Sequence, residues 1–200
     1  VSWSLGQEDE SIWEYYSDWL NGSYYCDITD SWAYNEINYA TVNGLMEGIN
    51  STKFSPKEDL TRAEMAAVIC RLLDLDNILA NESVFNDVYS SHWAYDYINT
   101  VYSHGIMIGN SNNFYPNDNI TREEASAVFF RILEGSKTQF KSAFQDIEKG
   151  RWSEKYIMFC YENNIFTGYP DNTFKPKFFL TREELAALLS RVYNSRFCEF

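Results

Sequence analysis

The sequence has little of the material from which most catalytic and metal sites are built. Its 200 residues include two histidines and four cysteines, and no two cysteines have the CxxC spacing of a zinc or redox site. Neither His92 nor His104 belongs to a recognisable Ser–His or Cys–His arrangement. No stretch approaches the roughly 18 apolar residues of a membrane span. These absences argue against zinc, thiol and triad chemistry, and against membrane insertion.

Positive charge is also scarce, with 16 Lys and Arg against 29 Asp and Glu and a net charge of −13. A negative field repels nucleic acid and anionic membrane surfaces, so we expect neither as a partner. An anionic ligand would need a locally basic spot built from particular Arg or Lys residues. No signal peptide precedes the chain, which begins at Val1, so we expect a mature or excised piece of a longer protein.

Aromatic residues, in contrast, are plentiful: 15 Tyr, 14 Phe and 6 Trp, within a chain that is 45% hydrophobic. This content excludes an intrinsically disordered chain. Tyr and Trp rings near the surface would suit recognition of a ligand. Two of the cysteines, Cys70 and Cys160, fall in helical stretches and are expected to be buried as small apolar side chains.

One tetrapeptide pattern, Thr-Arg-x-Glu, occurs three times at a fixed spacing. Its arginines are Arg62, Arg122 and Arg182, each 60 residues after the previous one. The positions that recur around it are Asp27, Asp87 and Asp146; Trp32, Trp93 and Trp152; Gly48, Gly109 and Gly168; Phe54, Phe114 and Phe174; Pro56, Pro116 and Pro176; and Arg71, Arg131 and Arg191. So many matched positions do not arise three times by chance, and the chain is therefore a threefold tandem repeat.

Each repeat predicts a helix, an irregular crossing and a second helix. In the second repeat the first helix has the apolar face Ala94, Ile98, Val101 and Tyr102, and Gly105 is expected to end it. The second helix follows the Thr of the motif with apolar residues at i, i+3, i+4 and i+7. These residues are Met65, Val68, Ile69 and Leu72; Ala125, Val128, Phe129 and Ile132; and Leu185, Leu188, Leu189 and Val192.

Two such helices cannot bury their apolar faces alone, whereas three copies can share one core. The predicted fold is therefore mostly α, a pseudo-threefold bundle of three helix-loop-helix repeats with projecting loops, spanning 25–82, 83–140 and 141–200 as one compact module. Residues 1–24 form an N-terminal extension with an aromatic helix, which either packs on the bundle or is the stub of a neighbouring domain. Cys26 and Cys198 flank the repeats. The sequence leaves two alternatives for this pair: a disulfide bond, or two free thiols.

The motif Thr-x-x-Glu is a capping box, in which the Thr side chain and the Glu side chain each satisfy a helix-end N–H. The capping pairs are Thr61 with Glu64, Thr121 with Glu124, and Thr181 with Glu184. The capping box does not explain the arginine of the motif. Its positive charge lies beside the positive end of the helix dipole, where a cation is unfavourable. Free helix-end N–H groups beside a guanidinium would bind an anion. The alternative is an ion pair between each arginine and an acidic neighbour, such as an aspartate of the adjacent repeat. The later arginines, such as Arg71, need no functional explanation, since positive charge is favourable late in a helix.

The recurring Trp and Asp residues also leave two interpretations open. Trp32, Trp93 and Trp152 are either core anchors or flat faces offered to a sugar ring. Asp27, Asp87 and Asp146 either cap a nearby turn or accept hydrogen bonds from sugar hydroxyls. An Arg, a Trp and an Asp repeated together would suit an acidic saccharide.

These patterns closely resemble the S-layer homology family. The strings that carry the resemblance are Phe85-Asn86-Asp87-Val88, His92-Trp93-Ala94, Gly105-Ile106-Met107-Ile108-Gly109, Phe114-Tyr115-Pro116 and Ile120-Thr121-Arg122-Glu123-Glu124. The resemblance covers about residues 25–195, and a threefold ordered series of this kind is highly specific.

The resemblance implies a pseudo-trimer with three prongs whose grooves bind a secondary cell wall polysaccharide, often pyruvylated on an N-acetylhexosamine. It implies that the motif arginines bind the acidic group of the polysaccharide and that the recurring Asp and Trp residues line the grooves. It also implies a location on the bacterial cell surface, outside the cell. Other S-layer subunits, or a catalytic domain attached in the parent protein, are further partners that the resemblance leaves open. The remaining alternative is a protein-interaction or self-assembly module with structural arginines.

Several positions depart from the family pattern. Asn164 replaces a glycine and Ser153 an alanine, and the first repeat is one residue shorter between Asp27 and Trp32. Glu123 and Glu183 replace the alanine of Thr-Arg-Ala-Glu, and we expect them to weaken anion binding by repulsion. The three grooves are therefore expected to be unequal.

Metal and catalytic functions find no support in the repeat. An EF-hand loop ending at Glu124 would put Tyr115 at an oxygen-ligand position and Asp118 where a glycine is required. The glutamates of the motif already have capping roles. The sequence therefore predicts no metal, no cofactor and no enzyme.

Overall fold

The computed structural model describes residues 25–78, 83–135 and 144–197, and only the backbone of 194–197. Its helices are α2 (Tyr34–Val42), α3 (Arg62–Leu72), α4 (Tyr95–Ser103), α5 (Arg122–Ile132), α6 (Glu154–Glu162) and α7 (Arg182–Phe197). These ranges contain no strand, only isolated β-bridges. The mostly-α prediction is therefore confirmed. The predicted helix in 1–24 and the Cys26–Cys198 pairing involve positions outside the described residues, and the predicted repeat boundaries stay predictions.

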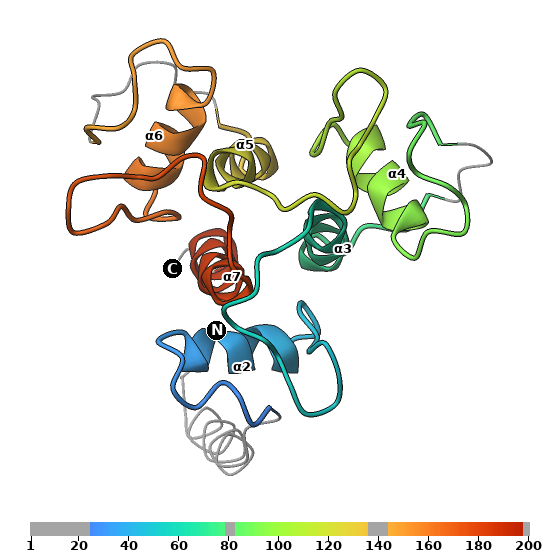
Figure 1. The fold of residues 1–200 in the computed structure, drawn as a ribbon, viewed down its shortest axis with the longest axis horizontal. Helices are drawn as coiled ribbons and strands as arrows, with labels where there is room; N and C mark the ends of the chain where they lie inside the picture. The colour runs from blue at the N-terminus through green and yellow to red at the C-terminus, as the bar shows by residue number, and fades with distance from the viewer. Residues whose placement is uncertain (1–24, 79–82, 136–143, 198–200) are drawn as a thin grey trace, which may run out of the picture.

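The helices are arranged with pseudo-threefold symmetry. Helices α3, α5 and α7 meet at the centre, and α2, α4 and α6 each lie in one of three arms (Figure 1). Each arm helix packs on the central helix of the preceding repeat: α4 on α3, α6 on α5, and α2 on α7. Because the first arm packs on the last central helix, the three repeats close into a ring.

The arm helices end where the sequence predicts. Gly105 has a φ of 67° directly after the C-cap residue of α4, a left-handed conformation that glycine adopts without steric cost. Gly44 has the same φ after α2, and Asn164 takes a φ of 57° after α6. Asparagine is one of the few other residues that tolerates this conformation, so the replacement of the family glycine leaves the helix end unchanged.

The apolar faces predicted for the central helices are buried. Each of the twelve residues is at most 8% exposed, and they belong to one continuous core. The arm-helix residues Ala94, Ile98 and Val101 are fully buried as predicted. Tyr102 differs: it is 39% exposed, and its ring packs edge-on against Phe85 at a centroid distance of 4.9 Å.

A ring of backbone hydrogen bonds joins the three repeats at the centre. Leu60 N–H donates to the carbonyl oxygen of Leu180 (2.8 Å), Leu180 N–H to that of Ile120 (2.9 Å), and Ile120 N–H to that of Leu60 (2.9 Å). All three side chains are fully buried. Each repeat therefore donates one bond and accepts one, and the ring is complete only when all three are present.

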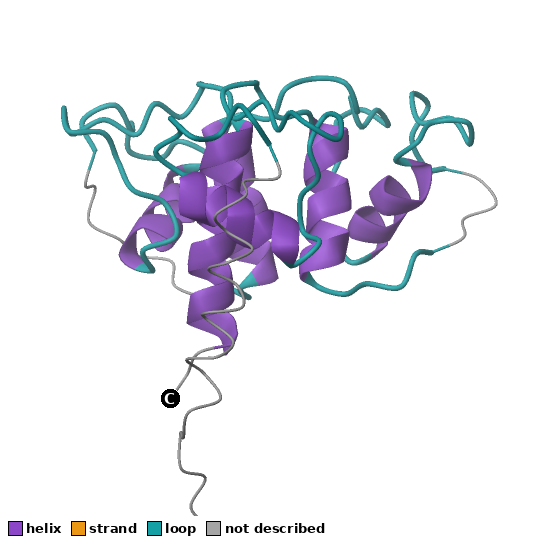
Figure 2. Ribbon diagram, turned by 90° about the horizontal axis from the view of Figure 1, so that it is seen from below, coloured by secondary structure: helices purple, strands orange, loops and turns teal. Residues whose placement is uncertain are grey.

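The loops between arm and central helices gather at one end of the molecule, above the helix bundle (Figure 2). The recurring glycines lie where these loops pass close to an aromatic ring. A side chain at Gly109 would collide with the ring of Phe85 and with the carbonyl oxygen of Asn113, and Gly48 and Gly168 are equally crowded. Only glycine fits there, which explains its recurrence.

Candidate functional site

Three grooves lie between the repeats, and each is lined by all of them. Groove 1 (about 690 Å³) contains Arg182, Glu47, Glu64, Arg71 and Trp93. Groove 2 (about 310 Å³) contains Arg62, Ile108, Glu124, Arg131 and Trp152. Groove 3 (about 710 Å³) contains Arg122, Thr167, Glu184, Arg191 and Trp32. Each groove therefore has a wall from one repeat, a motif arginine from the repeat before it and a tryptophan from the repeat after it.

The motif arginine of each repeat is bonded to the next repeat around the ring. Arg122 donates from Nε to the Phe174 carbonyl oxygen (2.9 Å), from Nη1 to Glu184 Oε1 (2.7 Å) and from Nη2 to the Thr167 carbonyl oxygen (3.2 Å). The same three kinds of bond form from Arg62 to Phe114, Glu124 and Ile108, and from Arg182 to Phe54, Glu64 and Glu47. Of the five N–H groups on each guanidinium, two are left for a ligand.

These guanidinium groups are also packed against aromatic rings. The carbon at the centre of the Arg122 guanidinium lies 4.7 Å from the Phe174 ring centroid, and Arg62 has the same distance to Phe114. The side chain of Arg122 is 5% exposed and that of Arg62 is 12% exposed. Burial lowers the pKa of Arg62, although the Glu124 carboxylate opposes this shift. The ion-pair alternative is thus what the structure shows, with a glutamate of the adjacent repeat as the partner.

The helix-end N–H groups expected to be free are occupied, so this expectation was wrong. The N–H groups of Arg122 and Glu123 donate to the carbonyl oxygens of Phe178 and Pro176 (2.9 and 3.0 Å). The first two amides of α3 and α7 are bonded in the same way to the neighbouring repeat. The loop of the next repeat therefore takes the place in which an anion was expected.

The motif threonines and glutamates form capping hydrogen bonds at all three central helices. At α5, Thr121 Oγ1 accepts from Glu124 N–H (3.3 Å), and Glu124 Oε2 accepts from Thr121 N–H (2.9 Å). Thr61 with Glu64 and Thr181 with Glu184 are bonded in the same way. The other carboxylate oxygen of each glutamate accepts from the motif arginine of the preceding repeat. One glutamate thus holds both a helix end and a repeat junction.

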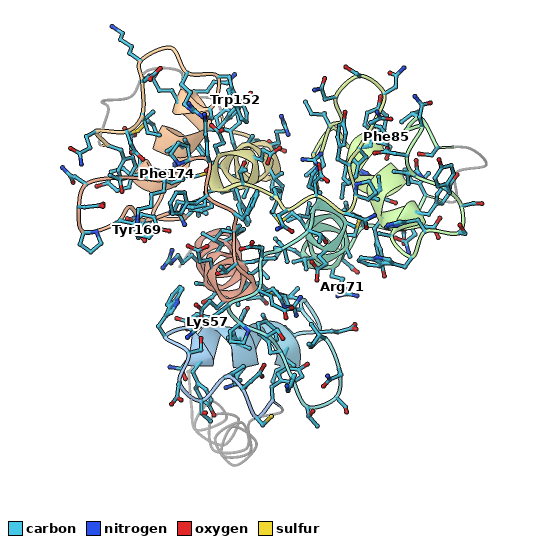
Figure 3. All side chains as sticks on the ribbon, viewed as in Figure 1. Lys57, Arg71, Phe85, Trp152, Tyr169 and Phe174 are labelled. Carbon is cyan, nitrogen blue, oxygen red and sulfur yellow. The ribbon has the colours of Figure 1, made fainter. Side chains whose placement is uncertain are left out.

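The recurring tryptophans lie on the surface. Trp32, Trp93 and Trp152 are 60%, 58% and 54% exposed, so the core-anchor alternative does not hold. Each lines the groove between the other two repeats. Figure 3 shows Trp152 on the side of the α6 arm that faces the arm of α4, where its side chain lines groove 2. An exposed indole beside a groove offers a flat apolar face with a polar edge.

The recurring aspartates hold the loops. Asp87 accepts through Oδ1 from Phe114 N–H (2.8 Å) and through Oδ2 from Tyr115 N–H (2.7 Å), and Asp27 and Asp146 bind the same two positions of their own repeats. Tyr115 has a φ of 59° directly before Pro116, a combination that is sterically unfavourable for a side-chain-bearing residue. The two bonds to Asp87 hold the backbone in this conformation, which matches the turn-capping interpretation.

The two extra motif glutamates differ in their surroundings: Glu123 is paired with a cation, whereas Glu183 lines groove 3. Glu123 is 7% exposed and accepts from Arg151 Nε (2.8 Å) and from Ser153 Oγ (2.5 Å). Glu183, equally buried, accepts from Ser31 Oγ (2.6 Å). The expected repulsion therefore has no structural basis at Glu123. The two departures Glu123 and Ser153 compensate each other, because each supplies the partner that the other needs.

Sequence reasoning missed the second set of arginines, which lie in the walls of the grooves. Arg131 donates from Nη1 to the Ile106 carbonyl oxygen (2.8 Å), and Arg191 donates to that of Ile165 (2.9 Å). Arg71 makes a longer bond to the Leu45 carbonyl oxygen (3.5 Å), and Figure 3 shows it on α3, on the side toward the arm of α2. The signal was available: nine residues are about two and a half helical turns, so the two arginines of one helix lie on opposite sides and reach different grooves.

The cysteines of the core offer no reactive thiol. Cys70 and Cys160 are buried as predicted. Burial raises the pKa of the Cys70 thiol to about 11 and raises that of Cys160 further. In the portion of the chain that the structure describes, no three His, Cys, Asp or Glu side chains are grouped as a metal site, and no helix is long and apolar enough to cross a membrane.

Comparisons with known proteins agree with the threefold architecture. The family model "S-layer homology domain" matches residues 25–66, 84–126 and 143–186. The chain is 36% identical over 171 residues to an amylopullulanase of Thermoanaerobacterium thermosulfurigenes, covering 82% of this chain and 9% of that protein. It is 35% identical over 155 residues to a cellulosome-anchoring protein of Acetivibrio thermocellus, covering 73% and 34%. It is 27% identical over 168 residues to an S-layer protein of Bacillus thuringiensis subsp. finitimus, covering 81% and 20%.

The chain thus spans between 9% and 34% of the length of these relatives. The three family matches coincide with the three repeats seen in the structure, and together they cover more than half of the chain. The chain belongs to the S-layer homology domain family, of which it carries three tandem copies.

Proposed function

We propose that this module anchors a bacterial surface protein non-covalently to the cell envelope by binding a secondary cell wall polysaccharide in the grooves between its repeats. It acts outside the cell, at the bacterial surface. The observation that carries the proposal is the exposed tryptophan in each groove, 54–60% accessible, beside arginine side chains. An indole face packs on a sugar ring, and arginine binds a carboxylate.

The ligand of this proposal carries an acidic group, such as a pyruvate ketal on an N-acetylhexosamine. A neutral polymer would form weaker hydrogen bonds with the arginines than a carboxylate does. The chain has a net charge of −13, so a uniformly anionic polymer would be repelled overall. A polymer with single acidic groups at intervals would match the arginines, which are likewise separated from one another in different grooves. The motif arginines contribute through their remaining N–H groups at the base of each groove, and the aspartates contribute by holding the loops in place.

The named relatives are consistent with this role. One is called a cellulosome-anchoring protein, another an S-layer protein, and a third is an enzyme of which the matching segment is 9% of the length. A module shared by proteins with such different names suits attachment better than catalysis. We therefore assign no catalytic activity to these repeats, and any chemistry of the parent protein belongs to other domains.

Calorimetric titration of the chain with purified cell wall polymer tests the proposal. Intact polymer should bind, and polymer from which ketal pyruvate has been removed by mild acid should bind at least about tenfold more weakly, the effect of losing a charge-assisted hydrogen bond. Equal binding of both forms would show that neutral sugar carries the affinity. No binding to either would contradict the proposal.

One observation favours a second function, self-assembly or protein interaction. The motif arginines are structural, since each uses three donors within the protein. Sedimentation velocity over a wide range of chain concentration separates the two functions. A monomer at all concentrations that binds polymer supports anchoring, whereas reversible association without polymer binding supports self-assembly.

A further inference from the structure

The three grooves share one backbone frame but differ in the surroundings of the wall arginines, defined as Arg71 in groove 1, Arg131 in groove 2 and Arg191 in groove 3. The motif arginines at the base of each groove are already paired with glutamates and almost buried. A glutamate therefore already balances the charge of each, and two N–H groups are left for a ligand. The wall arginines are half-buried and make fewer bonds to the protein, so they are the better source of an anion site.

The guanidinium groups of Arg131 and Arg191 are each held by one hydrogen bond to the backbone and have no acidic partner among the described residues. Their Nη1 groups donate to the backbone carbonyl oxygens of Ile106 and Ile165 (2.8 and 2.9 Å). Within the described ranges, no carboxylate lies at ion-pair distance from either guanidinium. A guanidinium held in one orientation, with most of its five N–H groups unused, is prepared to bind a carboxylate through two parallel hydrogen bonds.

Arg71 is in a different state because of Glu47. The Glu47 carboxylate lies 3.3 Å from Arg71 Nη2, where the corresponding positions of the other repeats hold Ile108 and Thr167. The Glu47 side chain is 75% exposed, so this ion pair adds little stability. Its negative charge nevertheless balances that of Arg71 and would repel a ligand carboxylate nearby.

The residues that follow the recurring proline of each repeat increase the contrast between the grooves. The first repeat places Glu58 in groove 1 and Asp59 in both groove 1 and groove 3, whereas the third repeat places Phe178 and Phe179, both about half exposed, in groove 3. Lys177 also lines groove 3. Groove 1 is therefore the most acidic of the three, with four carboxylates against two arginines. In groove 3 three carboxylates are matched by Arg122, Lys177 and Arg191, beside the aromatic surface.

We propose that Arg131 in groove 2 and Arg191 in groove 3 bind the acidic group of the glycan, and that Glu47 excludes this group from groove 1. The module is then divalent for its ligand, and groove 3 is its tighter site. This proposal rests on the proposed function, and it specifies which grooves and which arginines perform it.

The test titrates the whole chain with a small probe, the methyl glycoside of an N-acetylhexosamine bearing a 4,6-pyruvate ketal, and with the same glycoside lacking the ketal. The unaltered chain should bind two equivalents of the first probe. Arg131→Gln and Arg191→Gln should each remove one site, weakening it about tenfold or more. Arg71→Gln is the matched control and should leave binding unchanged. Glutamine keeps one donor for the backbone carbonyl, and thermal unfolding checks the fold of each variant.

A gain-of-function variant keeps the proposal falsifiable if the arginine variants unfold. Glu47→Ile installs the residue of the second repeat and frees Arg71. It should create a third site, strengthening groove 1 at least about fivefold, because a neighbouring carboxylate at 4 Å costs about that factor even in water.

Three equal sites in the unaltered chain, or an Arg71→Gln variant that binds as weakly as Arg191→Gln, would overturn the proposal. In either case the polymer still binds and the proposed function stands. If neither the polymer nor the ketal-bearing probe binds, the proposed function fails and this inference fails with it.

Discussion

Replacing Arg122 with alanine should cost more in folding than in ligand contact. The substitution removes three hydrogen bonds, to Phe174, Glu184 and Thr167, and leaves the carboxylate of Glu184 without its cation at a junction where its side chain is 21% exposed. Removing one partner of a buried ion pair typically costs about 3–5 kcal/mol. Because whole domains of this size are stable by about 5–15 kcal/mol, we expect a loss of about 3–5 kcal/mol to bring the ring near unfolding.

The assay is urea denaturation followed by far-ultraviolet circular dichroism, in parallel with Arg191→Ala as a control. Arg191 has one hydrogen bond to the residues that the structure describes, so its loss should cost about 1 kcal/mol. A loss below about 1 kcal/mol for Arg122→Ala, equal to that of the control, would refute the conclusion that the motif arginine is a structural tie between repeats. Such a result would instead support a motif arginine that is free to bind an anion.

Three further perturbations test other features. Gly109→Ala should destabilise the fold by about 1–3 kcal/mol, measured by urea denaturation, because its methyl group collides with Phe85 and with backbone. Glu134→Gly should stabilise it by about 1 kcal/mol, seen as a higher Tm, because Glu134 has a φ of 51° after α5. Burial raises the pKa of Asp27, but backbone N–H groups outweigh it and the net pKa lies below 3.8. Ionised Asp27 therefore stabilises the fold above about pH 4, and this stability is lost as the pH falls through the lowered pKa. Asp27→Asn should lack that part of the acid transition in circular dichroism.

The sequence predicts the elements of this fold better than their partners. Capping and apolar periodicity locate the central helices because both are local signals, and Gly105 marks a helix end for the same reason. Periodicity shows which face of α2 is apolar, but not that α7 at the far end of the chain covers it. That pairing depends on closure of the ring, which no local pattern encodes.

The candidate site was predictable in its residue types and less so in their roles. A cation at a helix N-terminus is anomalous, which correctly marked Arg62 as needing a partner. The sequence could not say that the partner is Glu124 rather than a ligand, because Glu124 already had a complete explanation as a cap. Glu123 and Ser153 each departed from the family pattern, and only their proximity in space shows that they form one interaction.

The ring of hydrogen bonds through Leu60, Ile120 and Leu180 fixes the copy number of the repeat at three. An open solenoid can gain or lose a unit, because each unit contacts only its neighbours. Here the first unit is a neighbour of the last, so a fourth copy would have no place and a chain of two would leave an unpaired junction. During synthesis, α2 is made before α7, the helix on which it packs among the described residues. The module therefore passes from incomplete to complete in one step, when its C-terminal helix emerges.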